Sequence, residues 1–197
     1  MILIPSPYEA KYHTMRMDPE LVEWIQGEQK WLDCKDKNVE LAFVEKYLEQ
    51  WNIPKNKMWS SKFGEKLVEL LLSQKYPEVI HLNTLSPEQK RLYRNPLCSK
   101  LPDLETRDFF VEVKTRNYTT QGTAGDKVLA EPIFQRNYYE FLGKPLIIVL
   151  VGYMEYEVRV KNKTRFGIFD EQDTRFADFI ASFHISFKGC SELLQPL

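Results

Sequence analysis

The chain has 197 residues, of which 43% are hydrophobic and 28% charged, and its formal net charge is −1. This mixture fits one globular domain with a real core. The longest apolar run, 146–153, is less than half of the roughly 20 residues that a membrane-spanning helix needs. The first ten residues lack the order of a signal peptide. We therefore expect a soluble, intracellular, cytoplasmic protein with no membrane partner, and three scattered cysteines predict neither disulfides nor a structural zinc site.

The near-neutral net charge hides an uneven distribution along the chain. Residues 1–51 sum to −4, residues 52–102 to +5 and residues 103–197 to −2. Proteins that bind nucleic acids usually carry a basic excess, which displaces counterions from phosphates. The total argues weakly against a phosphate-bearing partner, whereas the basic middle segment is compatible with one.

Helical patterns dominate the first third of the sequence. Asp18-Pro19 resembles an N-cap followed by proline at the first helical position, and apolar residues at helical spacing then predict two helices before residue 52. A third helix is predicted over 62–76, capped by Ser60 or Ser61 and ended by Tyr76-Pro77.

Strand patterns alternate with helices in the centre of the chain. The expected elements are a short strand at 79–82, a basic connection at 85–100, a hairpin of 101–105 with 109–115, a loop at 117–127, a helix at 132–141 and a buried strand at 146–151. Residues 155–160 alternate as an edge or hairpin strand does. The tail predicts a helix over 173–183 and a strand over 184–187. The centre therefore has the order α-β-β-β-α-β within one α/β domain, 1–197.

Three charged residues of the hairpin indicate chemistry. Residues two apart in a strand share a face, so Glu112 and Lys114 project side by side, and the preceding strand supplies Asp103 after a proline. These charges are costly to bury without partners. We expect Asp103 and Glu112 to converge on one divalent cation with Lys114 beside it. The alternative is an edge strand whose charges face solvent.

Such an arrangement suits the hydrolysis of phosphodiesters. That reaction needs a hard cation at the scissile phosphate, a nucleophilic water and positive charge on the transition state. Oxygen ligands select Mg²⁺ over a soft metal. Lys114 is expected to orient or help deprotonate the water and to offset charge on the phosphate oxygens.

At these residues the chain resembles the PD-(D/E)xK nuclease superfamily, with the signature standing as Pro102-Asp103 and, after eight intervening residues, Glu112-Val113-Lys114. The resemblance implies a restriction-endonuclease-like core over 60–152, a mixed central sheet flanked by helices. Residues 1–59 would add helices, and residues 153–197 would add strands and a helix.

The resemblance also implies a helix glutamate that completes the metal shell. Glu65 and Glu69 both fit, four residues apart on one face of the predicted helix. We favour Glu65, because Gly64 before it allows a close approach to the sheet. A surface glutamate in solvent is the alternative for each.

The loop after the catalytic strand has the composition of a phosphate-binding segment. Its glycines let backbone N–H groups approach a phosphate, and its polar side chains donate further hydrogen bonds. The predicted DNA contacts are Thr119, Thr120, Gln121, Gly122, Thr123 and Lys127. An ordinary connecting loop is the alternative. Gln135 and Tyr139 have the spacing of a QxxxY helix, but we interpret them as packing residues, and the three histidines share no metal-binding spacing.

The leading hypothesis is a Mg²⁺-dependent endonuclease for double-stranded DNA, of the type II restriction kind, with Asp103, Glu112, Lys114 and Glu65 as catalytic residues. One such core cuts one strand, so a double-strand cutter needs two cores, and we predict a homodimer. The alternatives are a structure-specific nuclease, such as a junction resolvase or repair endonuclease, and a non-catalytic DNA-binding module.

Overall fold

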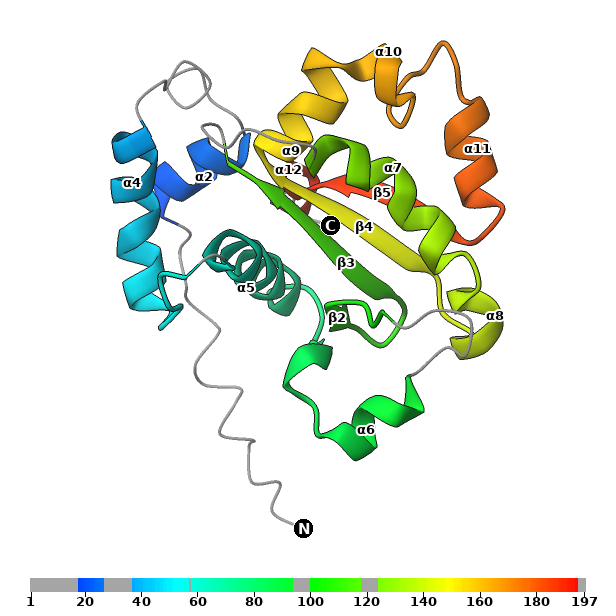
Figure 1. Cartoon of the computed structure of the whole chain (residues 1–197), viewed down its shortest axis with the longest axis horizontal. Coiled ribbons are helices and arrows are strands. Elements are labelled where there is room, and N and C mark those ends of the chain that lie inside the picture. The colour runs from blue at the N-terminus through cyan, green and yellow to red at the C-terminus, as the bar shows by residue number, and fades with distance from the viewer. Residues whose placement is uncertain (1–17, 27–36, 57, 94–99, 118–123, 195–197) are drawn as a thin grey trace.

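The computed structural model describes residues 18–26, 37–56, 58–93, 100–117 and 124–194 (Figure 1). Its first part comprises α2 (Pro19–Gln26), α4 (Lys37–Gln50), α5 (Trp59–Ser73), β1 (Ile80–His81), η1 (Leu82–Thr84), α6 (Pro87–Leu92), β2 (Leu104–Glu105) and β3 (Phe110–Arg116). The chain continues through α7 (Ala124–Gln135), α8 (Tyr138–Leu142), β4 (Leu146–Gly152), α9 (Tyr153–Tyr156), η2 (Glu157–Lys161), α10 (Lys163–Phe166), α11 (Arg175–Ala181), β5 (Ile185–Gly189) and α12 (Cys190–Leu193).

The strands form one mixed sheet in the order β1-β2-β3-β4-β5. β1, β2 and β3 pair antiparallel, whereas β3, β4 and β5 run parallel. The two parallel connections pass through helices, as parallel strands require. The prediction of a mixed α/β fold with a central sheet flanked by helices is confirmed.

Each face of the sheet has its own hydrophobic core, because successive side chains of a strand point to opposite faces. Val111, Val113 and Val149 pack beneath α2, α4 and α5. Phe110, Ile148 and Leu150, with their neighbours, pack against Val128 of α7 and the helices that follow β4. Figure 1 shows α5 on one side of β3 and α7 on the other.

Gly64 allows α5 to lie directly against β3. A Cβ built at this position would lie 1.7 Å from Oγ1 of Thr115, a separation that no side chain can adopt. The expected close approach at Gly64 is therefore confirmed. It holds the first half of α5, including Glu65, against the C-terminal part of β3.

The prediction of a strand over 155–160 is wrong, because this segment lies in α9 and η2. Gly152 ends β4 with a φ of 65°. Met154 and Val158 are both buried, and Glu155 forms an ion pair with Arg159 four residues later. These pairs have helical spacing, which the alternating letters of the sequence concealed.

Other predicted elements also differ from the structure. The helix predicted over 132–141 is two helices, α7 and α8, and α7 starts at Ala124, so Pro132 lies inside it. The end of the predicted loop, including Lys127, therefore belongs to α7. The basic connection contains α6, which has a capping box between Ser86 and Gln89. The third helix begins at Trp59, without a serine cap.

Within the described ranges no helix has the length and apolarity to cross a membrane. Cys190 is a buried free thiol, as expected of an ordinary core cysteine. Cys34 and Cys98 lie outside the described residues.

Candidate active site

Asp103 lies where β2 separates from β3. The two strands pair only through Leu104 with Val111 and Glu105 with Phe110. Just before β2, Asp103 donates its N–H to the carbonyl of Val111 at 2.9 Å and accepts the N–H of Val113 on Oδ2 at 2.7 Å. The carboxylate thus occupies the edge of β3 that β2 leaves open. Asn83 donates to its other oxygen at 3.4 Å.

Glu112 and Lys114 project from the same face of β3, as the alternation of the strand predicts. Nζ of Lys114 lies 2.5 Å from Oε1 of Glu112 and 3.0 Å from Oε2 of Glu131 on α7. Oε2 of Glu112 is buried and has no hydrogen-bond partner among the residues that the structure describes. A buried carboxylate oxygen without a partner is costly, and it marks a position where a ligand would be stabilised.

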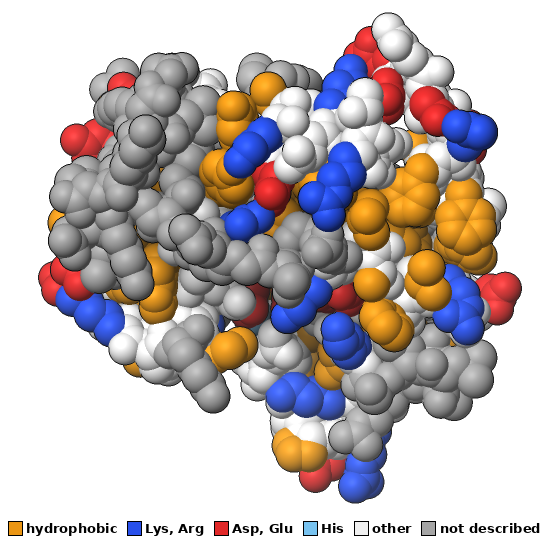
Figure 2. Space-filling view, turned by 45° about the horizontal axis from the view of Figure 1, so that its top comes forward, with side chains coloured by type: hydrophobic (Ala, Val, Ile, Leu, Met, Phe, Trp, Pro, Cys, Tyr) orange, Lys and Arg blue, Asp and Glu red, His pale blue; other side chains and the backbone are white. Residues whose placement is uncertain are grey.

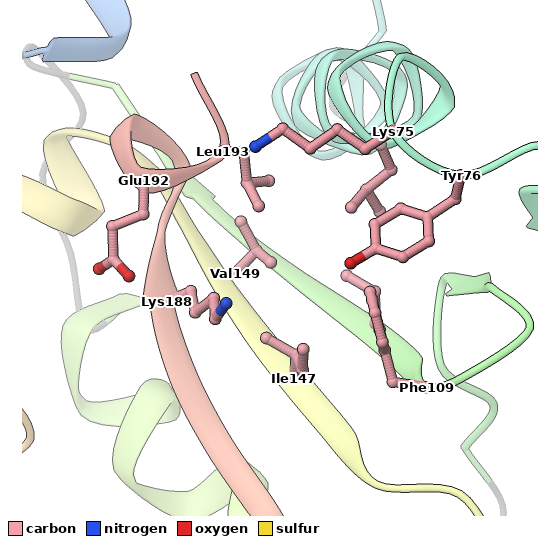
Figure 3. A pocket seen from close by; sticks show the side chains of 10 residues that line it. Lys75, Tyr76, Phe109, Ile147, Val149, Lys188, Glu192 and Leu193 are labelled. Carbon is pink, nitrogen blue, oxygen red and sulfur yellow. The ribbon is translucent and has the colours of Figure 1, made fainter. Parts of the chain in front are cut away.

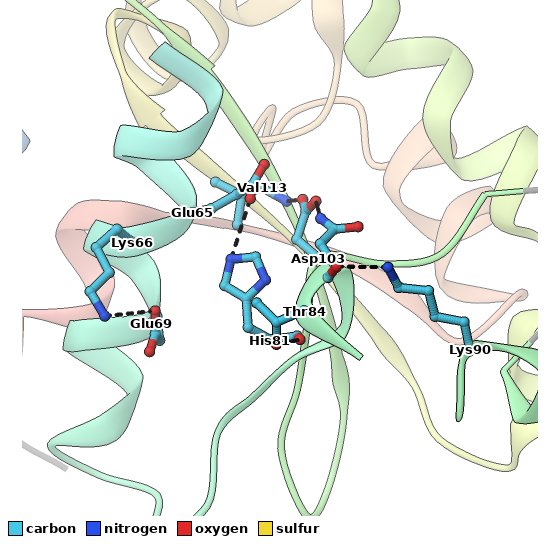
Figure 4. Close-up of polar contacts among 9 residues, drawn as sticks. Glu65, Lys66, Glu69, His81, Thr84, Lys90, Asp103 and Val113 are labelled. Carbon is cyan, nitrogen blue, oxygen red and sulfur yellow. Dashed lines mark hydrogen bonds and ion pairs between the residues drawn. The ribbon is translucent and has the colours of Figure 1, made fainter. Parts of the chain in front are cut away.

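Glu65 points from α5 toward the sheet, and its Oε2 lies 3.3 Å from Nε2 of His81 (Figure 4). Its charge also acts on Asp103. Glu69, one turn further along α5, forms an ion pair with Lys66 at 3.0 Å. The structure therefore brings Glu65, and not Glu69, toward the other predicted site residues.

Both hairpin carboxyl groups have raised pKa values, chiefly because they are buried. Burial, together with the Glu65 carboxylate, raises the pKa of Asp103 from 3.8 to about 6, although the N–H of Val113 opposes this. Burial and the Asp103 carboxylate raise the pKa of Glu112 from 4.5 to about 8. Each group is thus easier to ionise when positive charge is brought close.

The lysine and the α7 glutamate have the opposite tendency. Burial works to lower the pKa of Lys114, but the Glu112 and Glu131 carboxylates outweigh it and raise that pKa. Burial works to raise the pKa of Glu131, but the charge of Lys114 outweighs it and lowers that pKa. Lys114 is therefore held as an ammonium and Glu131 as a carboxylate.

This donor set suits a hard divalent cation. It offers carboxylate oxygens from Asp103, Glu112 and Glu65, and one of them, Oε2 of Glu112, is buried without a partner in the described segments. In the part of the chain that the structure describes, no group of three or more His, Cys, Asp or Glu is gathered to hold a metal ion. The carboxylates bond instead to Val113, Lys114 and His81. Binding a cation therefore requires them to turn from these partners.

The predicted DNA-binding loop falls almost entirely outside the described residues. Thr119, Thr120, Gln121, Gly122 and Thr123 lie there. Lys127 is exposed on the first turn of α7. Figure 2 shows Lys and Arg side chains gathered from the middle of one face to its lower tip. The basic excess of 52–102 includes Lys90 and Arg91 of α6, a helix without a buried residue.

The structure adds residues to the site that the sequence pattern did not indicate. Glu131 is 3% exposed and contacts Lys114, yet no motif spacing relates it to the hairpin. Gln135, interpreted from the sequence as a packing residue, is fully buried and donates to Oε1 of Glu131 at 3.1 Å. Tyr139 instead stacks on His184, with ring centroids 3.6 Å apart. The i,i+4 spacing of Glu131 and Gln135 in the sequence is compatible with the hydrogen bond between them, but it does not indicate the contact of Glu131 with Lys114.

A cavity of about 260 Å³ lies on the other face of the sheet (Figure 3). Val111, Ile147 and Val149 line it, and Val111 points away from the face that carries Glu112 and Lys114. Lys75 and Lys188 lie at its rim. This cavity is separate from the site.

Comparisons of the chain with protein-family models, with curated proteins and with solved structures return no match.

Proposed function

We propose that this protein is a Mg²⁺-dependent endonuclease that hydrolyses phosphodiester bonds of double-stranded DNA, in the manner of a type II restriction enzyme. One observation carries the proposal. Where β2 leaves β3, two buried carboxyl groups whose pKa values are raised chiefly by burial, Asp103 and Glu112, lie beside the ammonium of Lys114. Burying like charges together is unfavourable unless a cation compensates them.

Asp103, Glu112 and Glu65 are the residues that would hold the cation. A divalent cation at such a site polarises the phosphate and makes a bound water more acidic. Glu65 reaches the site because Gly64 lets α5 lie against β3. Nε2 of His81, on β1, lies 3.3 Å from Oε2 of Glu65 and so contacts its carboxylate.

Lys114 acts in this proposal as a hydrogen-bond donor. Its raised pKa keeps a proton on Nζ at neutral pH, so the side chain is poorly suited to remove a proton from water. An ammonium at this position donates a hydrogen bond to a lone pair of the attacking water and so orients it. The same positive charge offsets negative charge on the phosphate oxygens. Of the roles expected of Lys114, orientation of the water and compensation of phosphate charge therefore remain in the proposal, and deprotonation of the water does not.

The test is cleavage of a DNA of known sequence. Purified protein with Mg²⁺ should give discrete fragments, and sequencing of their ends should return one recognition site. Asp103→Asn should abolish the fragments while the circular dichroism spectrum stays unchanged. A wild-type protein that leaves linear DNA intact but cuts a four-way junction would favour a structure-specific nuclease. DNA binding without cleavage under any divalent cation would favour the non-catalytic module.

Two-strand cleavage also leads us to propose a homodimer, in which each copy cuts one strand. Sedimentation of the protein with a DNA duplex that contains its site measures this. Two copies per duplex are expected. One copy per duplex would leave a nickase as the better description.

A further inference from the structure

Glu131 is a buried carboxylate that the Asp-Glu-Lys pattern does not include. It projects from α7, is 3% exposed, and contacts the same ammonium of Lys114 that Glu112 contacts. A carboxylate at this depth is stable only with charged or hydrogen-bonding partners. Its partners are Lys114, Gln135 and Lys100, with Nζ of Lys100 at 3.6 Å from Oε2.

Lys114 is shared between two carboxylates. An ammonium has three donors, so the contacts to Oε1 of Glu112 and Oε2 of Glu131 are made together. On Glu112 the ammonium occupies the oxygen of a residue proposed to bind the cation. A cation at the buried Oε2 of Glu112 and the ammonium at Oε1 would repel one another, so cation binding at Glu112 favours movement of the ammonium away from Oε1.

Glu131 is oriented to receive the displaced ammonium. Gln135 is fully buried one turn further along α7, and its Nε2 donates to Oε1 of Glu131. This bond fixes the carboxylate plane and leaves Oε2 directed at Lys114. The ammonium therefore keeps a charged partner after it leaves Glu112, and it stays beside the cation site.

We propose that Glu131 is a positioning residue, which takes over Lys114 when a divalent cation binds Glu112 and thereby makes the metal site available. The inference rests on the proposed function and deepens it, since it assigns a residue to the competition between lysine and cation. Without Glu131, Lys114 would keep Glu112 as its counter-charge and would compete more strongly with Mg²⁺.

The test measures Mg²⁺ binding without DNA, by the rise in unfolding temperature as Mg²⁺ is added after treatment with EDTA. Glu131→Gln should raise the Mg²⁺ concentration at half-saturation by about tenfold, the equivalent of about 1.4 kcal/mol. Lys114→Met should lower it. In the Lys114→Met background, Glu131→Gln should have no further effect, because the group that Glu131 holds is gone.

Two further variants distinguish the orientation of the Glu131 carboxylate from the mere loss of a negative charge. Gln135→Met leaves every charge in place but removes the bond that orients Glu131, and it should weaken Mg²⁺ binding by about threefold. Glu69→Gln removes one carboxylate that pairs with Lys66 and should leave binding unchanged. If Glu131→Gln destroyed the fold, Gln135→Met would still test the inference.

Failure of the inference and failure of the proposed function give different results. A wild-type protein that neither binds Mg²⁺ nor cleaves DNA would refute the proposed function. Wild-type binding that Glu131→Gln and Gln135→Met both leave unchanged would refute the inference alone. An effect of Glu131→Gln that persists undiminished with Lys114→Met would also overturn it, because that result shows direct attraction between Glu131 and the cation.

Discussion

Replacing Glu112 by Gln should stabilise the metal-free protein at alkaline pH. Burial and the Asp103 carboxylate raise the pKa of Glu112 from 4.5 to about 8. At about 1.4 kcal/mol per pKa unit, ionising this side chain in the folded protein costs up to about 4 to 5 kcal/mol. The folded state keeps the proton to higher pH than the unfolded state, so the cost is absent below the unfolded pKa, grows as the pH rises, and is complete above the folded pKa. A glutamine is neutral throughout.

Urea unfolding in EDTA at about pH 5 and about pH 9 measures this difference. Between these conditions, the free energy of unfolding of Glu112→Gln should gain about 2 to 5 kcal/mol relative to wild type, or about 5 to 15 °C in unfolding temperature. Glu69→Gln controls for the loss of one negative charge. If Glu112→Gln instead lost the same amount of stability relative to wild type at both pH values, the reasoning would be refuted. That result would mean that Lys114 fully compensates the negative charge of the buried Glu112 carboxylate.

Three other predictions test the site and its supports. Glu65→Gln should reduce cleavage of plasmid DNA by at least about 100-fold, whereas Glu69→Gln should stay within about twofold of wild type; equal losses would remove Glu65 from the site. Gly64→Ala should lower the free energy of unfolding by about 2 to 3 kcal/mol, because its Cβ would meet Thr115, and wild-type stability in urea would contradict that packing. The Mg²⁺ concentration at half-saturation should fall as the pH rises from about 6 to about 8, since protons compete with the cation at both hairpin carboxylates; calorimetry at three pH values checks this, and no dependence on pH would contradict it.

The strands that carry the site could be predicted because their patterns are strong. The runs that became β3 and β4 are rich in β-branched residues, and they lie in a two-sided core where such runs are stable. The pairing of Glu112 with Lys114 followed from alternation alone. Gly64 indicated the close approach of α5, since a glycine inside a helix is otherwise unfavourable.

The remaining features depend on contacts between distant segments. Residues 155–160 alternate in sequence, but Glu155 bonds to Ser191, and this long-range contact favours the helix. Glu131 meets Lys114 only because α7 begins at Ala124 and crosses the sheet there. No local spacing predicts such a meeting. His81 of β1 likewise lies beside Glu65 of α5, 16 positions earlier in the chain.

Cleavage of supercoiled plasmid by the wild type and by Lys114→Ala, with Mg²⁺ and with EDTA, tests the central claim most directly. We expect the wild type to linearise the plasmid only with Mg²⁺, and Lys114→Ala to be slower by at least about 1,000-fold with its fold intact. Cleavage by Lys114→Ala at the wild-type rate, or cleavage that continues in EDTA, would contradict a metal-dependent site built on Asp103, Glu112 and Lys114.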